Sequence, residues 1–149
     1  MLYKVWVFVH LAGVFGFLVA HGSSAAAGMR LRKERDPVRV QALLELSAST
    51  RSWMYVSLAV LAVGGVAAGI QGHWFDFAWV WWSMGILVLM LAVLVVLAVP
   101  YYRMVRGALA GDPGRLDRVL SSRLPLAMAA IGGVGLIVLL WLMVLKPGT

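Results

Sequence analysis

The chain has 149 residues, of which 62% are hydrophobic and 13% are charged. Too few polar residues remain to cover the surface of a water-soluble domain, so the composition excludes that class of protein. Cysteine is absent, which excludes disulfides, thiolate metal sites, iron–sulfur clusters and covalently attached haem c. The net charge of +7 comes without a basic groove interleaved with aromatic residues, so nucleic acid is not an expected partner.

Four apolar runs are long enough to cross the roughly 30 Å hydrocarbon core of a bilayer. They are Leu2–Ala27, Trp53–Gly72, Phe77–Tyr102 and Leu124–Leu145. The first run resembles a signal peptide, but the basic segment "RLRKER" directly after it favours a retained span. We therefore expect an all-α, integral membrane four-helix bundle that forms a single transmembrane domain over residues 1–149.

The basic residues are segregated between the two ends of this expected bundle. Two connections hold eleven of them: Arg30, Arg32, Lys33, Arg35, Arg39, Arg51, Arg103, Arg106, Arg115, Arg118 and Arg123. The opposite face holds Lys4 and Lys146. The positive-inside rule therefore predicts cytoplasmic connections and outward-facing termini, as in a multi-pass protein of the bacterial inner membrane. Contact with anionic lipid head groups is also expected at the basic connections.

Two segments, 76 residues apart, resemble each other: "RDPVRVQALL" at 35–44 and "GDPGRLDRVL" at 111–120 share Asp-Pro-x-Arg, an aliphatic residue and a later Leu. Asp36 and Asp112 are typical helix N-caps, and the proline after each suits the first helical position. Each segment therefore predicts a tight turn between two helices. The alternative is that the two turns arose independently, because Asp-Pro turns are common.

The repeat predicts two helical hairpins related by a pseudo-twofold axis along the membrane normal. The first hairpin covers 2–72 with its cytoplasmic turn near residue 36, and the second covers 77–145 with its turn near residue 112. A tight corner at residue 36 also sets the register of the first hairpin, in which facing residues have numbers that sum to about 73.

Small residues recur at every fourth position of the first span. They are Ala12, Gly16, Ala20, Ser24 and Gly28. Membrane helices associate through such stripes because small side chains let the backbones approach closely. We expect a tight interface along this helix; the alternative is that glycine and alanine are simply frequent in membrane spans.

Two histidines lie in the first span, His10 and His21. Eleven residues of α-helix place them on one face, about 20° apart and about 16 Å apart along the axis. The register places His10 near the middle of the membrane and His21 near the cytoplasmic interface. Ionisable residues inside a membrane are functional candidates, and stacked imidazoles are typical of membrane b-type cytochromes. His10 and His21 are therefore candidate ligands of haem b.

A second axial ligand at the depth of His10 is not obvious. His73 lies at the outer end of the second span, so Met90, near the middle of the third, is the candidate within the chain. An open coordination position, or a histidine from a second copy, would serve instead. Copper held by His10, His21 and His73 is an alternative, with methionine as a soft ligand for Cu(I). Equally open is a bundle in which the histidines form only hydrogen bonds and no cofactor binds.

The stretch "HLAGVFGFLVAHGSS", followed by "RLRKERDP" and three further spans, resembles the DUF2269 family of bacterial integral membrane proteins. That family is similar in layout to the membrane domain of copper resistance protein D. The resemblance covers nearly the whole chain, and His10 and His21 match its motif. It implies a four-span fold and a link to copper by layout only.

These features favour a small membrane protein that binds haem b, or copper, in an electron-transfer or metal-handling role. Ser-His-Asp spacing, a phosphate-binding glycine loop and a metalloprotease motif are all missing from the sequence, so no catalytic residue is predicted. The alternative is a non-catalytic accessory or assembly subunit without a cofactor of its own. In either case the expected partners are the lipid bilayer and either a second copy or a larger membrane complex.

Overall fold

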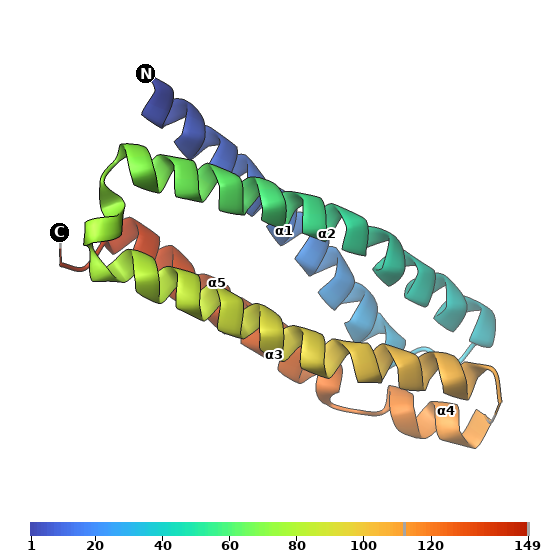
Figure 1. Cartoon of the computed structure of the whole chain (residues 1–149). Coiled ribbons are helices and arrows are strands. Elements are labelled where there is room, and N and C mark those ends of the chain that lie inside the picture. Colours follow the sequence, from blue (N-terminus) through green and yellow to red (C-terminus); the bar gives the residue numbers. More distant parts are fainter. Residues whose placement is uncertain (112, 149) are drawn as a thin grey trace.

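The computed structural model describes residues 1–111 and 113–148, with Pro113 described by its backbone only. This part of the chain is all-α (Figure 1), which confirms the predicted fold class. The elements are α1 (Leu2–Leu31), α2 (Pro37–Gln71), the 3₁₀ turn η1 (Trp74–Asp76), α3 (Ala78–Leu109), α4 (Pro113–Leu120) and α5 (Leu124–Leu145).

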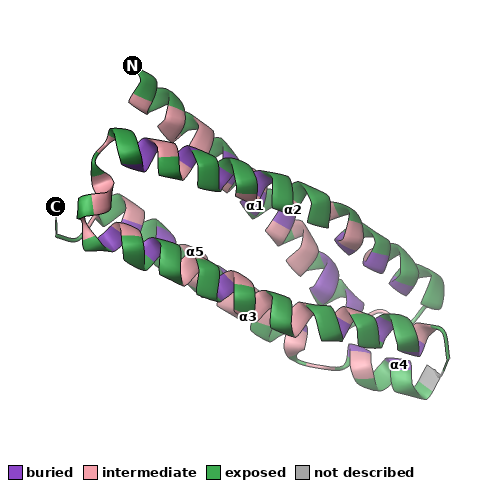
Figure 2. Cartoon of the chain, viewed as in Figure 1, coloured by how far each residue is buried: buried purple, intermediate pink, exposed green. Residues whose placement is uncertain are grey.

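Four helical segments in the described part are long and apolar enough to cross a membrane. Three of them are α1, α2 and α3, and the fourth, Gly114–Leu145, takes in α4 and α5. Exposed positions run along most of their length (Figure 2). They include many Leu, Val, Ile, Phe and Trp residues. Such a surface is stable in hydrocarbon and unstable in water, so the chain is a four-span membrane protein.

The predicted turn near residue 36 is confirmed. The side chain of Asp36 accepts a hydrogen bond from the backbone N–H of Val38 at 2.9 Å, and Pro37 is the first residue of α2. Both termini lie at one end of the bundle, and this corner lies at the other end together with α4 (Figure 1). We call the end with the α1–α2 corner and α4 the basic end, because both basic connections lie there.

The helix bounds agree with the predicted repeat. A shift of 76 residues moves the start of α1 at Leu2 onto the start of α3 at Ala78, and Pro37 onto Pro113. Asp112, the predicted cap of the second turn, lies outside the described residues. The two halves differ in one respect, since α2 is continuous whereas its counterpart is divided into α4 and α5.

The division between α4 and α5 has a local cause. Pro125 has no N–H to donate back into the preceding turn, which favours a helix start just before it. The hydroxyl of Ser122 accepts a hydrogen bond from the backbone N–H of Leu124 at 3.2 Å, and this satisfies one of the free donors at the new N-terminus. The chain therefore begins α5 afresh at Leu124.

Within the first hairpin, α1 and α2 touch backbone to backbone. A Cβ atom on Gly13 would lie 2.7 Å from the Cα of Leu61, and one on Gly64 would lie 2.8 Å from the Cα of His10. Nearer the basic end, the hydroxyls of Ser24 and Ser47 share a hydrogen bond of 3.1 Å. The numbers of these facing residues sum to between 71 and 74, so the predicted register is confirmed.

The two hairpins are joined at the basic end by a buried apolar cluster. All of its members are less than 9% exposed, and they come from α1, α2, α3 and α4: Leu31, Val40, Leu44, Tyr101, Val105, Ala108, Leu116 and Leu120. Figure 2 shows buried positions on these helices at the basic end. We call this set the junction core.

At the opposite end, one indole links the hairpins. The Nε1 of Trp74 donates a hydrogen bond to the hydroxyl of Tyr3 at 3.2 Å, and the Nζ of Lys146 lies 4.0 Å from the centre of the Trp74 ring. The ring of Trp79 lies 5.9 Å away on α3. Trp74 therefore contacts the start of α1, the start of α3 and the end of α5, and such cation–π and aromatic contacts contribute on the order of 1 kcal/mol each.

Candidate functional site

The imidazole ring of His10 packs between α1 and α2. Its ring is half-buried, and its Nδ1 donates a hydrogen bond to the backbone carbonyl of Leu61 at 2.8 Å. The ring fits because Gly65 has no side chain, and a Cβ there would lie 2.8 Å from Nδ1. A carbonyl oxygen only accepts, so the proton is on Nδ1 and the lone pair is on Nε2.

His21 faces a different helix. Its ring stacks on that of Phe17, with centroids 5.8 Å apart and planes 5° apart, and its Nε2 lies against Gly132 of α5. His10 contacts α2, whereas His21 contacts α5. The two residues do follow each other along one side of α1, as predicted, but the neighbour on that side changes along the helix. The two imidazoles therefore do not converge on a common point.

The other predicted ligands also lie apart from His10. Met90 on α3 is 5% exposed, and its sulfur lies against Gly135 of α5. His73 is exposed in the turn between α2 and η1, where its backbone is left-handed with φ of 55°. Within the described residues, no three of the His, Asp and Glu side chains form a group that could hold a metal ion.

The predicted stripe of small residues divides between two partners. Gly16 lies against Ser57 and Ser24 bonds to Ser47, so both face α2. Gly28 is buried and faces the second hairpin, with Tyr102 and Pro125 nearest to it. Ala20 is 5% exposed, whereas Ala12 is exposed and its neighbour Gly13 makes the contact with α2.

This division has a geometric cause. Residues four apart advance by about 400° around a helix, so the stripe turns by about 40° at each step. Over five positions it passes from the lipid side, across α2, to the second hairpin. Most of the stripe is therefore occupied by contacts inside the chain, and little of it is left to bind another protein.

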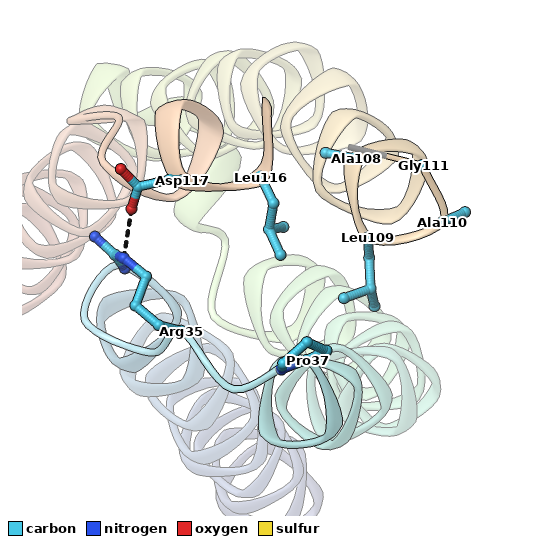
Figure 3. A pocket seen from close by; sticks show the side chains of 8 residues that line it. All are labelled: Arg35, Pro37, Ala108, Leu109, Ala110, Gly111, Leu116 and Asp117. Carbon is cyan, nitrogen blue, oxygen red and sulfur yellow. Dashed lines mark ion pairs between the residues drawn. The ribbon is translucent and has the colours of Figure 1, made fainter. Parts of the chain in front are cut away.

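A cavity of about 200 Å³ lies at the basic end, between the α1–α2 corner and the ends of α3 and α4 (Figure 3). Its lining includes Leu109, Leu116 and an ion pair between Arg35 and Asp117. The two charged residues neutralise each other across the cavity. A second, open groove of about 460 Å³ between α3 and α5 has an apolar lining that includes Met90 and Gly135.

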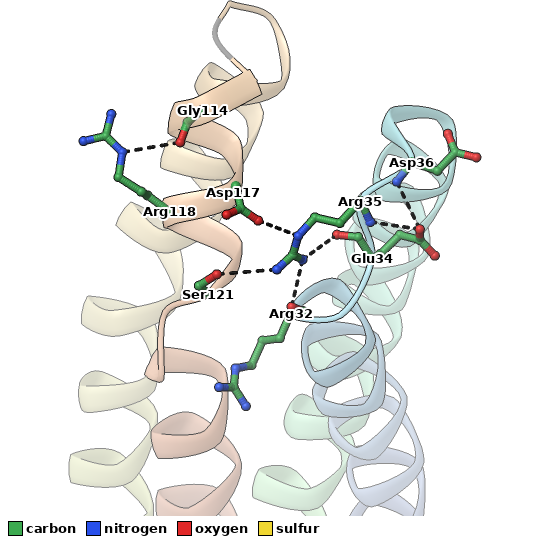
Figure 4. A network of polar contacts seen from close by, with 8 residues as sticks. All are labelled: Arg32, Glu34, Arg35, Asp36, Gly114, Asp117, Arg118 and Ser121. Atoms are coloured by element: carbon green, nitrogen blue, oxygen red, sulfur yellow. Dashed lines mark hydrogen bonds and ion pairs between the residues drawn. The ribbon is translucent and has the colours of Figure 1, made fainter.

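Polar contacts connect the two hairpins beside this cavity (Figure 4). The Nη1 of Arg35 donates to the carbonyls of Arg32 at 3.0 Å and Glu34 at 2.9 Å, while its Nε faces the carboxylate of Asp117. The Nε of Arg32 donates to the carbonyl of Ser122 at 2.9 Å. These arginines therefore fasten the first corner to the α4–α5 break.

Glu34 shapes the same corner. Its carboxylate accepts hydrogen bonds from the backbone N–H groups of Asp36 at 3.1 Å and Arg35 at 2.9 Å, and these bonds hold its pKa below the ordinary value of 4.5. The sequence analysis missed the roles of Arg35 and Asp117, because charge spacing along a chain does not show which loops meet. The proline at position 125, directly after Leu124, was a signal for the helix break.

Comparison with known proteins adds no relative. No protein-family model, curated protein or solved structure matches the chain. The resemblance to the DUF2269 family therefore stays a prediction.

Proposed function

We propose that this chain is a small four-span protein of the bacterial inner membrane that binds haem b through His10 in an electron-transfer role. The basic connections face the cytoplasm in this proposal, following the positive-inside rule. The observation that supports it is the hydrogen bond from the Nδ1 of His10 to the carbonyl of Leu61. Histidines that bind metals are commonly held by this kind of bond, because it orients the ring and leaves Nε2 as the donor atom.

The surroundings of His10 support a ligand role as well. Gly64 and Gly65 make a recess for the backbone and the ring, so the imidazole has one restricted orientation. His10 is eight residues from the start of α1, about 12 Å into the apolar segment. An imidazole at this depth is costly unless it has partners, and Nε2 is the atom that the fold leaves for one.

The donor set fits a haem that takes one ligand from this chain. His21 faces Gly132, and the sulfur of Met90 faces Gly135, so neither is aimed at the Nε2 of His10. Any further protein ligand would come from a second copy of the chain. Haem bound in this way would supply one-electron chemistry, and His10 would set its depth in the membrane. Copper ranks lower, because a copper site needs several donors that converge.

Absorption spectroscopy of the purified protein tests the proposal. After expression with a haem precursor and extraction in mild detergent, we expect a Soret band in the wild type that is lost in His10→Ala. External imidazole should restore the band in His10→Ala, because it replaces the missing ligand. His73→Gln is the matched control, since His73 is exposed in a turn, and it should keep the full band.

Two results would overturn haem binding at His10. One is a wild-type protein with no Soret band even after titration with haem. The other is a His10→Ala protein that keeps the band without imidazole. Elemental analysis of the same samples for copper tests the alternative that the protein binds copper instead of haem.

An accessory or assembly subunit without its own cofactor is the second candidate. It is favoured by the contacts of His21, whose ring packs against Phe17 and Gly132 inside the bundle. Native mass spectrometry after gentle extraction distinguishes the two candidates. An accessory subunit should co-purify with a larger membrane protein in stoichiometric amount, and a lone protomer without partners would contradict this candidate.

A further inference from the structure

The arginines of the basic end fall into two groups. Four of them have partners: Arg35 is paired with Asp117, Arg39 with Asp36, Arg32 with the carbonyl of Ser122 and Arg118 with that of Gly114. Arg30, Arg51 and Arg115 have none among the described residues, and neither do three arginines at the membrane boundary of the second hairpin. The side chains of Arg103, Arg106 and Arg123 are exposed and have no ion pair or hydrogen bond with any residue that the structure describes. We call these three the basic triad.

The triad lies at one level of the second hairpin. The contact between Met90 and Gly135 sets the register of α3 against α5, and this register places Arg123 level with residue 102. Arg103 and Arg106 are three residues apart on α3, so they share a face of that helix. All three therefore lie within about one helical turn of each other along the bundle axis.

This level is the boundary of the apolar spans. Arg103 and Arg106 follow the end of the apolar run 77–102, and Arg123 directly precedes the run 124–145. Side chains at this depth reach the head-group region of a bilayer. Two of the three positions differ from the first hairpin. The counterparts of Arg103 and Arg123 there are Ala27 and Ser47, which are buried against neighbouring helices, whereas the counterpart of Arg106 is Arg30, which is also exposed.

We propose that the basic triad binds the phosphate groups of anionic phospholipids in the leaflet at the basic end. Arginine binds phosphate through several parallel N–H donors, and unpaired guanidinium groups at head-group depth are complementary in charge to these lipids. At two of the three equivalent positions the first hairpin packs small residues between helices, whereas the second presents charge to the membrane. The partner of the basic triad is a lipid rather than an acidic protein, because the three arginines border the apolar spans and not the water-exposed corner.

Lipid selectivity in nanodiscs tests this proposal. The wild type and R103Q/R106Q/R123Q are placed in an equimolar mixture of phosphatidylglycerol and phosphatidylcholine, and the lipids retained by the protein are counted by native mass spectrometry. We expect phosphatidylglycerol to be enriched on the wild type. Enrichment should fall by up to about 100-fold in the triple variant, since each basic residue near the surface contributes about a fivefold preference.

The matched control is K33Q/R39Q/R115Q, which removes the same three charges beyond the boundary of the spans. It should keep most of the enrichment. Equal losses in the two triple variants, or no loss in the triad variant, would overturn the proposal. Co-purification of an acidic protein through the triad, without lipid enrichment, would overturn it too.

A measurement on the wild type covers the case in which a triple variant does not fold. Raising the salt concentration from about 0.1 M to 1 M shortens the Debye length from about 10 Å to 3 Å. The enrichment of phosphatidylglycerol should fall with it. Enrichment that does not change with salt would contradict binding by the exposed triad.

Discussion

The closest helix contacts of the two hairpins involve glycine in different ways. In the first, Gly13 and Gly64 bring the backbones of α1 and α2 into contact. In the second, Gly135 makes room for the long side chain of Met90, so α3 and α5 are held apart by that side chain. A glycine in a membrane span therefore has no single role, because its effect depends on whether the facing atom belongs to rigid backbone or to a flexible side chain.

The hairpins differ again at the basic end. The first has a continuous α2 and buries Ala27 and Ser47, whereas the second is broken before Leu124 and carries the exposed Arg103 and Arg123 at the equivalent positions. The two halves thus share the positions of their helix starts and differ in what faces outward. The junction core and the contacts of Arg35 hold these unlike halves together.

The largest expected effect separates the two uses of glycine. In Gly64→Ala the new Cβ would lie 2.5 Å from the backbone N of His10, and neither backbone can yield without separating the helices. We expect a loss of about 3 kcal/mol in the free energy of unfolding. Gly135→Ala should cost less than about 1 kcal/mol, because the facing atom is the flexible sulfur of Met90. Unfolding titrations in mixed detergent measure both.

Gly133→Ala is the control for helix propensity in this comparison. A Cβ on Gly133 would have no described atom outside its own helix within 4 Å, so the variant should be neutral or slightly stabilising. Equal costs for Gly64→Ala and Gly135→Ala would mean that the two hairpins are packed alike, against the structure.

A smaller effect, in the stabilising direction, is expected in the junction core. The hydroxyl of Tyr101 is fully buried and has no hydrogen-bond partner among the described residues. An unmatched buried polar group costs about 1 kcal/mol or more, so Tyr101→Phe should raise the free energy of unfolding by about that amount. Tyr102→Phe, at a half-buried neighbour, is the comparison and should have little effect. A destabilised Tyr101→Phe would indicate that the hydroxyl is in fact bonded, for example to a buried water.

The ion pair between the hairpins should contribute less. The side chains of Arg35 and Asp117 are 49% and 59% exposed, so water and salt screen their attraction. A double-mutant cycle with R35Q and D117N should give a coupling of about 0.5 kcal/mol that declines in high salt. The more exposed pair of Arg39 and Asp36, at 3.6 Å, should give a coupling close to zero. A coupling of several kcal/mol would show that charge, rather than the junction core, joins the halves.

The smallest effect concerns pH and the first corner. Because hydrogen bonds from Asp36 and Arg35 lower the pKa of Glu34 in the folded chain, the carboxylate stabilises the corner above pH 4.5. This contribution should be lost as the pH falls below 4.5 and through the lower folded pKa. Unfolding measured from pH 6 to pH 3 should show a slight decline in the wild type. E34Q should remove the part of the decline that comes from this residue, and an identical pH profile in E34Q would contradict the assignment.

Much of the fold could be predicted because it depends on local sequence. Four apolar runs of sufficient length predict four spans, and Asp36 followed by proline predicts the first corner. The corner in turn sets the register by simple geometry. The candidate site was predicted only in part: the position of His10 followed from this register, but its bond to Leu61 and the contact of His21 with Gly132 did not.

The sequence by itself determined the number of spans, the hairpin corner and the pairing of α1 with α2, because hydrophobic length and turn chemistry act between residues close in the chain. Tertiary structure alone decided where the rings of His10 and His21 face, which arginines find partners, and how the unlike halves meet in the junction core. The physical reason is that these features depend on how one hairpin lies against the other, and that placement comes from packing between segments about 80 residues apart.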